Sequence, residues 1–106
     1  MIFRGAIHEI KALPTARGHE QQGKRYGVVI QSDRFASSLT TVAMTSSRAG
    51  HAIYRPEIEL NGSLTRILTD QIFSLADSRL GTFTGALEPD ELMDLDRALM
   101  LKLGLV

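Results

Sequence analysis

The sequence predicts a small, mainly β domain in which five to seven short strands form a barrel-like sheet, with one C-terminal helix packed across it. Short β-branched and apolar runs, separated by glycine, proline and polar turn residues, continue to about residue 87. After that position the apolar residues recur at helical spacing. The chain has 106 residues, 43% of them hydrophobic, which is enough for one modest core. We therefore expect residues 1–106 to form a single domain.

The first half of the chain predicts three strands joined by polar segments. Residues 3–10 alternate between apolar and polar side chains, and residues 25–32 and 39–45 carry β-branched apolar runs. Between the first two strands, residues 11–24 are polar and contain one proline and two glycines, which predicts a long loop. A long loop in so small a domain is uncommon unless it is functional. Residues 33–38 form a connection that can include a short helical turn.

The second half predicts an edge strand, one or two strands after a tight turn, and a last strand. Pro56 places the strand expected over residues 52–60 at a sheet edge or a bulge. The NGS sequence that follows is a strong turn signal, and residues 64–75 then supply one or two strands. The remaining expected elements are a polar connection at 46–51, a helical turn at 76–80 and a last strand at 81–87.

The end of the chain predicts an amphipathic helix. Pro89 suits the first helical position, and the acidic residues around it favour the positive end of the helix dipole. Gly104 is a typical C-terminal stop. We expect the apolar stripe to belong to the core or to a subunit interface; its members are Leu92, Leu95, Leu99 and Leu103.

The composition excludes several classes of site. The chain has no cysteine, so disulfides and thiolate metal sites are excluded. His8, His19 and His51 are widely spaced with no carboxylate at ligand spacing, so we expect no metal site and no cofactor. Glu57 and Glu59 share one face of a strand and are expected to be solvated. No apolar run reaches the length of about 18 residues that a membrane span needs, and no signal peptide is recognisable, so we expect a cytoplasmic protein.

Charge is unevenly distributed, although the net charge is zero. Residues 1–55 contain eight Lys or Arg and three acidic residues, which gives +5. Residues 56–106 contain four Lys or Arg and nine acidic residues, which gives −5. A basic half can form a face that attracts phosphate groups even when the whole chain is neutral. The alternative is that the two halves interleave in space and the charges mix.

The stretch GHEQQGKR, residues 18–25, departs from a P-loop signature at its last position. Gly18, Gly23 and Lys24 fit G-x-x-x-x-G-K, but Arg25 replaces the Ser or Thr that would hold magnesium. A β-branched strand also follows in place of the helix that a P-loop requires. We therefore reject an ATPase or GTPase. The two cations can still bind phosphate, because a guanidinium donates two parallel hydrogen bonds. A solvated basic pair is the alternative.

Two further polar groups can take part in phosphate chemistry. Thr45, Ser46 and Ser47 form a hydroxyl cluster where the third predicted strand ends. Hydroxyls can donate to a phosphate oxygen, but they are also common turn residues. His19 lies beside Glu20 in the polar loop, where an exposed imidazole can transfer protons near neutral pH. An isolated loop histidine without a catalytic role is the alternative.

A series of stretches along the chain carries more information than any single motif. These are FRGAIHEI, GHEQQGKRYGVVIQSD, VAMTSS, TRILTDQIFSL, RLGTFTGAL and ELMDLDRALMLKLGL, and together they span about residues 2–105. In this order they resemble the MazF/PemK family of toxins from bacterial toxin–antitoxin systems. The resemblance implies an SH3-like, plasmid-maintenance-toxin (CcdB/MazF-like) barrel that works as a homodimer. It also implies a metal-independent endoribonuclease, or mRNA interferase, and a MazE-like antitoxin that covers the RNA site with an acidic segment.

The resemblance further implies which residues carry the site. The catalytic pair of the family falls on Arg25 and Thr45, and His19 is a weaker third candidate, for proton transfer. The other residues expected to bind RNA are Glu20, Gln21, Lys24, Tyr26, Ser46, Ser47, Arg48 and Gln71.

These residue types suit cleavage of single-stranded RNA, which carries its own nucleophile in the 2′-hydroxyl. The enzyme must align that hydroxyl with phosphorus and stabilise the charge that develops on the phosphoryl oxygens. Arg25 can stabilise this charge and help to protonate the leaving 5′-oxygen, and Thr45 can donate a hydrogen bond to the same phosphate. The expected products are a 2′,3′-cyclic phosphate and a 5′-hydroxyl.

The chain departs from the family pattern at two functional positions. Tyr26 replaces the proline that usually follows the catalytic arginine, and its ring can stack on a base or pack inside the domain. Phe73 replaces an arginine often found near the site. The arginines that can compensate are Arg48, Arg66 and Arg79. The segment 46–55 is also short, which predicts a change in the bases recognised.

Two other functions stay open at this level. A toxin of the same fold can inhibit a protein such as gyrase without catalysis, although such an inhibitor needs neither Arg25 nor Thr45. A plain SH3-like adaptor would need an aromatic groove, and the chain has two Tyr, four Phe and no Trp.

Overall fold

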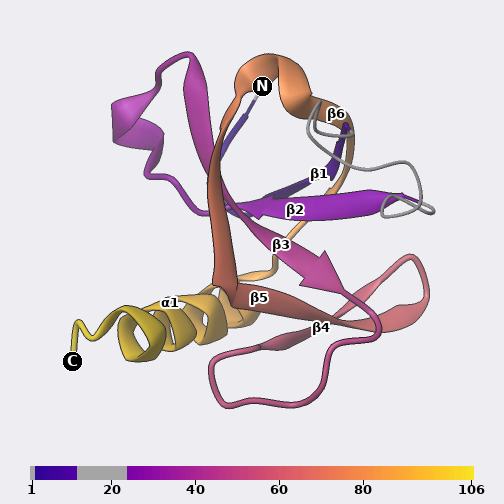
Figure 1. The fold of residues 1–106 in the computed structure, drawn as a ribbon, viewed down its shortest axis with the longest axis vertical. Coiled ribbons are helices and arrows are strands. Elements are labelled where there is room, and N and C mark those ends of the chain that lie inside the picture. Colours follow the sequence, from indigo (N-terminus) through magenta and orange to yellow (C-terminus); the bar gives the residue numbers. More distant parts are fainter. Residues whose placement is uncertain (1, 12–23) are drawn as a thin grey trace.

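The computed structural model describes residues 2–11 and 24–106, and these residues form one antiparallel six-stranded sheet and one α-helix (Figure 1). The sheet curls into a half-barrel, with the helix α1 (Pro89–Leu103) beside one end. The predicted mainly β fold with a C-terminal helix is confirmed. The strand order is β4-β5-β3-β2-β1-β6, and the bounds are β1 Ala6–Ile10, β2 Arg25–Val29, β3 Leu39–Ser46, β4 Glu57–Leu60, β5 Ser63–Ala76 and β6 Leu80–Ala86. Short 3-10 helices lie at η2 (Asp33–Phe35) and η3 (Asp77–Arg79).

The strand predicted over residues 52–60 is shorter than expected. β4 begins only after Pro56, and the residues before it form a turn in which the Arg55 N–H donates to the Ala52 carbonyl at 2.9 Å. Proline has no N–H for a sheet ladder, which explains why the strand starts after it. β4 is an edge strand, as Pro56 predicted. Its exposed carboxylates, also as predicted, are Glu57 and Glu59.

A two-residue turn joins β4 to β5. Asn61 and Gly62 have φ values of 52° and 79°, and the flanking Leu60 and Ser63 are paired. Two successive positive φ angles are typical of a type I′ hairpin turn, for which Asn-Gly is the preferred sequence. The NGS turn is therefore confirmed.

β5 is one continuous strand of 14 residues, where the sequence left one or two strands open. Its pairing with β3 changes register, because Ala43 pairs with Ile72 whereas Met44 pairs with Leu68. The three residues 69–71 of β5 therefore have no counterpart on β3. β5 bends sharply along its length in Figure 1. Bulges of this kind redirect side chains and are common beside active sites.

The two faces of the sheet carry separate apolar clusters. On one face, Leu95 and Leu99 of α1 pack with strand residues that include Val28, Ile58 and Ile67. On the other face, the curled sheet packs against itself; this cluster contains Ala6, Ile10, Val29, Val42, Met44 and Leu75. The sheet thus positions the ends of β2 and β3 rigidly, because residues on both faces are buried there.

The helix begins and ends as predicted, but its stripe is only partly buried. A capping box joins Glu88 to Glu91, and Gly104 ends the helix in the left-handed conformation with φ 71°. Leu95 is fully buried, whereas Leu103 is 54% exposed because the last turn extends past the sheet (Figure 1). Of the two roles expected for the stripe, the core is therefore confirmed for Leu95 and Leu99, and a subunit interface stays a prediction for Leu103. Within the described part of the chain, α1 is too short and too polar to cross a membrane.

Candidate functional site

A cavity of about 650 Å³ opens where the start of β2, the end of β3 and the β4–β5 hairpin meet. This volume is typical of pockets that bind small ligands. Its described lining contains four cationic residues and no acidic residue. All four come from the basic half of the sequence; they are Lys24, Arg25, Arg48 and Arg55. The cations of the basic half thus gather at this cavity, although Lys24 and Arg55 have acidic neighbours in Glu9 and Asp70.

Arg25 is the first residue of β2 and lies opposite Ile10 of β1. Its side chain is half-buried, which restricts the directions in which the guanidinium can point. Among residues 2–11 and 24–106, that guanidinium has no hydrogen-bond or ion-pair partner. Lys24 is more exposed and lies 3.8 Å from the Glu9 carboxylate. Arg25 thus has donors available for an anion in the cavity.

Thr45 lies inside β3 and is 7% exposed. Its hydroxyl donates to the backbone carbonyl of Tyr26, with 3.1 Å between the two oxygens. This bond crosses from β3 to β2, so it links Thr45 directly to the residue after Arg25. The sequence placed the two catalytic candidates on different strands, and the structure brings both into the lining of one cavity.

Ser46, Ser47 and Arg48 continue the lining beyond Thr45. The Ser46 hydroxyl oxygen accepts from the backbone N–H groups of Arg48 at 3.1 Å and Ala49 at 3.0 Å. The turn role considered for this cluster is therefore correct for Ser46, which also faces the cavity.

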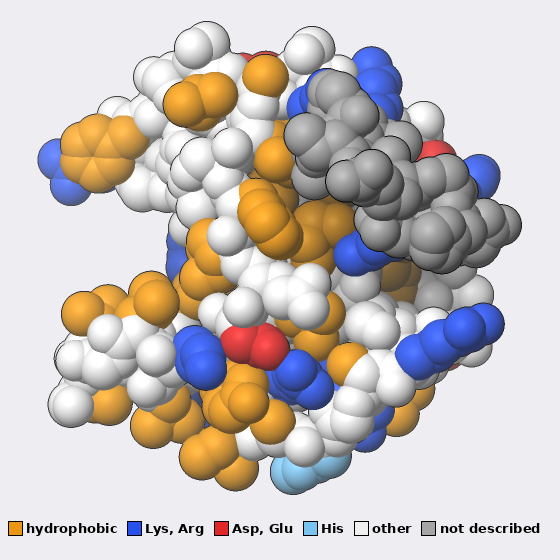
Figure 2. Space-filling model, viewed as in Figure 1, with side chains coloured by type: hydrophobic (Ala, Val, Ile, Leu, Met, Phe, Trp, Pro, Cys, Tyr) orange, Lys and Arg blue, Asp and Glu red, His pale blue; other side chains and the backbone are white. Residues whose placement is uncertain are grey.

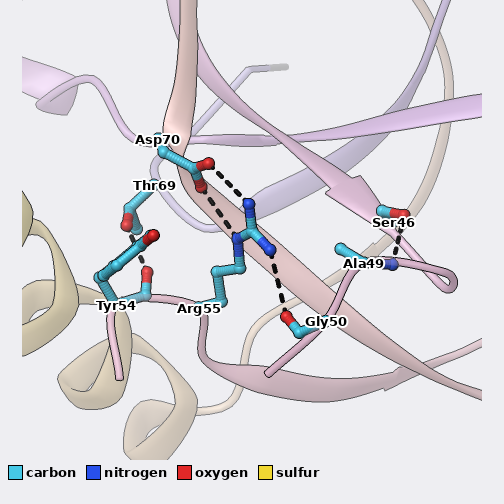
Figure 3. A network of polar contacts seen from close by, with 7 residues as sticks. All are labelled: Ser46, Ala49, Gly50, Tyr54, Arg55, Thr69 and Asp70. Carbon is cyan, nitrogen blue, oxygen red and sulfur yellow. Dashed lines mark hydrogen bonds and ion pairs between the residues drawn. The ribbon is translucent and has the colours of Figure 1, made fainter. Parts of the chain in front are cut away.

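Arg55 lies at the centre of a network that the sequence did not predict (Figure 3). Its Nε and Nη2 donate to the two carboxylate oxygens of Asp70 at 3.1 and 2.8 Å, and its Nη1 donates to the Gly50 carbonyl at 3.1 Å. This hydrogen bonding lowers the pKa of Asp70 and raises that of Arg55. Tyr54 lies next to the network, with the Lys102 ammonium 4.5 Å from its ring centroid, and its carbonyl accepts from the Thr69 hydroxyl.

The bulge at residues 69–71 places this network. Asp70 and Thr69 bind the segment before β4, and Gln71, which is exposed, lines the cavity. The expectation that Gln71 supports the site agrees with this position. Sequence reasoning missed Arg55 and the hairpin turn residue Asn61, which also lines the cavity. The sequence signals that could have found them were the pairs Arg55-Pro56 and Asn61-Gly62.

Several expected residues lie elsewhere. Phe73 is 42% exposed, and neither it nor Arg66 or Arg79 belongs to the described lining, so Arg48 is the one predicted compensating arginine found there. Tyr26 both lines the cavity and packs against the helix-side core. His19, Glu20 and Gln21, with Gly18 and Gly23, lie outside the described residues.

His8 belongs to β1 and lies outside the described lining of the cavity. It is buried, and its Nδ1 lies 3.0 Å from the Gly81 carbonyl. Its ring meets Phe83 edge-on at 5.6 Å. In the described part of the chain, no three potential metal ligands gather.

Comparison with known proteins identifies this arrangement. Residues 3–103 match the family model of PemK-like, MazF-like toxins of type II toxin–antitoxin systems. The chain belongs to this toxin family. A Mycobacterium tuberculosis protein that carries the provisional name of a toxin is 38% identical to this PemK/MazF-like toxin over 106 residues, covering 99% of this chain and 100% of that protein. The endoribonuclease MazF9 of the same organism is 33% identical, covering 99% and 98%.

The fold agrees with the family. A mycobacterial endoribonuclease solved in complex with its cognate antitoxin superimposes on this PemK/MazF-like toxin with a TM-score of 0.80. The match covers 100% of this chain and 98% of that chain at 14% identity. The curled sheet with one C-terminal helix is thus the common framework.

Proposed function

We propose that this PemK/MazF-like toxin is an endoribonuclease that cleaves single-stranded RNA, including mRNA, at a short sequence. The observation that carries the proposal is that Arg25 and Thr45, from neighbouring strands, line one cavity whose described lining has four cations and no acid. The name of the 33% identical MazF9 supports the same reaction. A cavity of this charge suits a polyanion that is held through its phosphates.

The reaction uses the nucleophile of the substrate. The 2′-oxygen attacks the adjacent phosphorus as it loses its proton, the bond from phosphorus to the 5′-oxygen breaks, and the 5′-oxygen takes up a proton. The products are a 2′,3′-cyclic phosphate and a 5′-hydroxyl, so no water enters this step. Most of the catalysis then consists of alignment and charge stabilisation.

Arg25 stabilises the negative charge on the phosphoryl oxygens. Its guanidinium stays protonated at any working pH and has no partner within the described residues, so its donors are available to the phosphate. It can also donate to the leaving 5′-oxygen. Since the side chain is half-buried, it has fewer orientations to lose when RNA binds, which favours electrostatic catalysis.

Thr45 supplies a second donor. In the RNA-free protein its proton points to the Tyr26 carbonyl, at 3.1 Å, which is longer than the usual distance of about 2.7–2.8 Å between hydroxyl and carbonyl oxygens. A weak bond of this kind is readily exchanged for a charge-assisted bond to phosphate. The hydroxyl therefore rotates toward the scissile phosphate when RNA occupies the cavity.

The remaining predicted residues bind the strand or move protons. Lys24 and Arg48 attract phosphates, the Tyr26 ring lies where a base can stack, and Ser46, Ser47 and Gln71 offer polar groups to the RNA. We assign proton transfer to His19 because an imidazole can exchange protons near neutral pH. The family resemblance implies that Glu20 and Gln21 are further RNA contacts. A His19→Ala variant that cleaves at the wild-type rate from pH 5 to 8 would overturn that assignment.

We also propose two protein partners. A MazE-like antitoxin would cover the cationic cavity with an acidic segment, since opposite charge suits both RNA and such a peptide. A second copy of the toxin would form a homodimer. Hydrophobic side chains gather over the C-terminal end of α1 (Figure 2), where exposed residues include Met100, Leu101, Leu103, Leu105 and Val106.

Cleavage of a long RNA in the presence of EDTA tests the proposal. Wild type should cut the RNA to fragments with 5′-hydroxyl ends, Arg25→Ala should not, and the mapped ends would give the recognised sequence. A 5′-phosphate product would contradict the mechanism. No cutting by a folded wild-type protein, together with inhibition of a protein such as gyrase, would favour the non-catalytic alternative.

A further inference from the structure

We propose that Arg55 is a further RNA-binding residue of the cavity, held by Asp70 and Gly50 so that it contacts a phosphate next to the scissile one. This inference rests on the proposed function and adds an arginine to those that the sequence offered in place of the family arginine at Phe73. Phe73 stands where relatives often carry an arginine, and it does not belong to the described lining. Arg55 does, and it reaches the cavity from the turn before β4.

The donors of Arg55 are only partly used. A guanidinium has five N–H groups. Three of them are accounted for by the two Asp70 oxygens and the Gly50 carbonyl, so two stay available among the described contacts. The side chain is 21% exposed, so these groups are not sealed in the core. Two donors on one planar group can bind one phosphate.

Asp70 fixes the direction of the guanidinium. The paired bonds at 3.1 and 2.8 Å hold the plane from one edge, and the Gly50 carbonyl holds a further nitrogen (Figure 3). The carboxylate comes from the bulge of β5, whose Gln71 also lines the cavity. The arrangement orders Arg55 before RNA binds, at the cost of neutralising part of its charge. Orientation, rather than simple attraction, is what Asp70 adds.

Arg66 offers a matched comparison. Its Nε and Nη2 donate to one oxygen of Glu57 at 3.1 and 2.8 Å, and its Nη1 donates to the Ala49 carbonyl at 2.8 Å. Both arginines thus join a carboxylate to a carbonyl of the same loop, at consecutive residues. Only Arg55 belongs to the described lining of the cavity. If both arginines were purely structural, replacing either one should affect RNA binding equally. If Arg55 contacts RNA, its replacement should weaken RNA binding more than the replacement of Arg66.

The test compares Arg55→Met, Arg55→Lys, Asp70→Asn and Arg66→Met. Binding is measured with a single-stranded 2′-fluoro RNA, which lacks the nucleophile, over a series of salt concentrations. Cleavage is measured on unmodified RNA under single-turnover conditions, and circular dichroism verifies that each variant is folded. Because the binding assay needs no cleavage, it tests Arg55 even if wild type is found not to cut RNA.

We expect Arg55→Met to weaken RNA binding by about tenfold and to reduce the salt slope by about 0.7, the value for one phosphate contact on a single strand. Asp70→Asn should bind RNA at least as tightly as wild type, because it releases the charge of Arg55, but should cleave more slowly because the guanidinium is no longer oriented. Arg55→Lys should keep the salt slope but not the full cleavage rate.

Two results would overturn the inference. One is that Arg55→Met and Arg66→Met bind RNA equally well. The other is that Arg55→Met and Asp70→Asn weaken binding to the same extent, since both variants break the same structural contact. If Arg55→Met does not fold, the opposite directions expected for binding and cleavage in Asp70→Asn still decide the question.

Discussion

Replacement of Thr45 by valine should slow RNA cleavage strongly while it changes the free energy of unfolding only slightly. The hydroxyl makes one recorded bond, 3.1 Å long, to the Tyr26 carbonyl, and its loss should cost about 0.5–1.5 kcal/mol. Residue 45 is only 7% exposed, so the methyl group that replaces the hydroxyl is buried. This burial should stabilise the fold by about 0.8 kcal/mol. The free energy of unfolding should therefore change by no more than about 1 kcal/mol.

The effect on cleavage should be much larger. Loss of one donor to a phosphoryl oxygen in the transition state costs about 2.7–4 kcal/mol, which is about 10²–10³ in rate. Urea denaturation would measure stability, and single-turnover cleavage of a mapped RNA would measure the rate. Thr45→Ser is the matched control, because it keeps the hydroxyl and should retain most of the activity. If folded Thr45→Val cleaves within about threefold of wild type, the assignment of Thr45 as a phosphate donor is wrong.

Three further predictions concern stability and assembly. Because Arg55 lowers the pKa of Asp70, the ionised carboxylate should stabilise the fold fully above the unfolded pKa of about 3.9, and this stabilisation should be lost as pH falls through the lower folded value. The thermal unfolding temperatures of wild type and Asp70→Asn should therefore approach each other on acidification, and a gap that does not narrow would argue against this linkage. Leu95→Ala, at a fully buried position, should lose about 2–5 kcal/mol of unfolding free energy in urea titrations, whereas Met93→Ala, at 55% exposure, should change it by less than about 0.5 kcal/mol. Leu103→Glu should halve the mass found by analytical ultracentrifugation if the exposed end of α1 forms the homodimer, and an unchanged dimer would exclude that surface.

The sequence predicted the elements well because their signals are local. Alternation, β-branched runs and the Asn-Gly turn depend on neighbouring residues only, and so does the helix stop at Gly104. The burial of Leu103 could not be predicted in the same way. Its position in the stripe matches that of Leu95, but whether a helical turn meets the core depends on where the sheet ends. That information is tertiary.

The candidate site, too, could be predicted only as far as its signals are local. Arg25 and Thr45 are 20 positions apart, and only the pairing of β2 with β3 brings them together. Residue chemistry alone therefore left each with a non-catalytic alternative, a solvated cation for Arg25 and a turn residue for Thr45. The family resemblance supplied the pairing. Arg55 was missed because its segment was predicted to be a strand. Its contact with Asp70, 15 residues away, leaves no local signal in the sequence. The bulge at residues 69–71 that presents Asp70 depends on a register change between strands distant in sequence.

The neutral net charge is compatible with a cationic cavity because no acidic residue belongs to the described lining, although Asp70 pairs with Arg55 from outside it. The cations of the described lining all come from residues 24–55, while acids of the second half lie on the edge strand and on α1, as with Glu57 and Asp94. A uniformly basic protein would bind any nucleic acid over its whole surface. Here four cations gather in the described lining of the cavity that holds Arg25 and Thr45. RNA captured by charge is therefore delivered to the residues proposed to cut it, and an acidic antitoxin segment would compete for the same place.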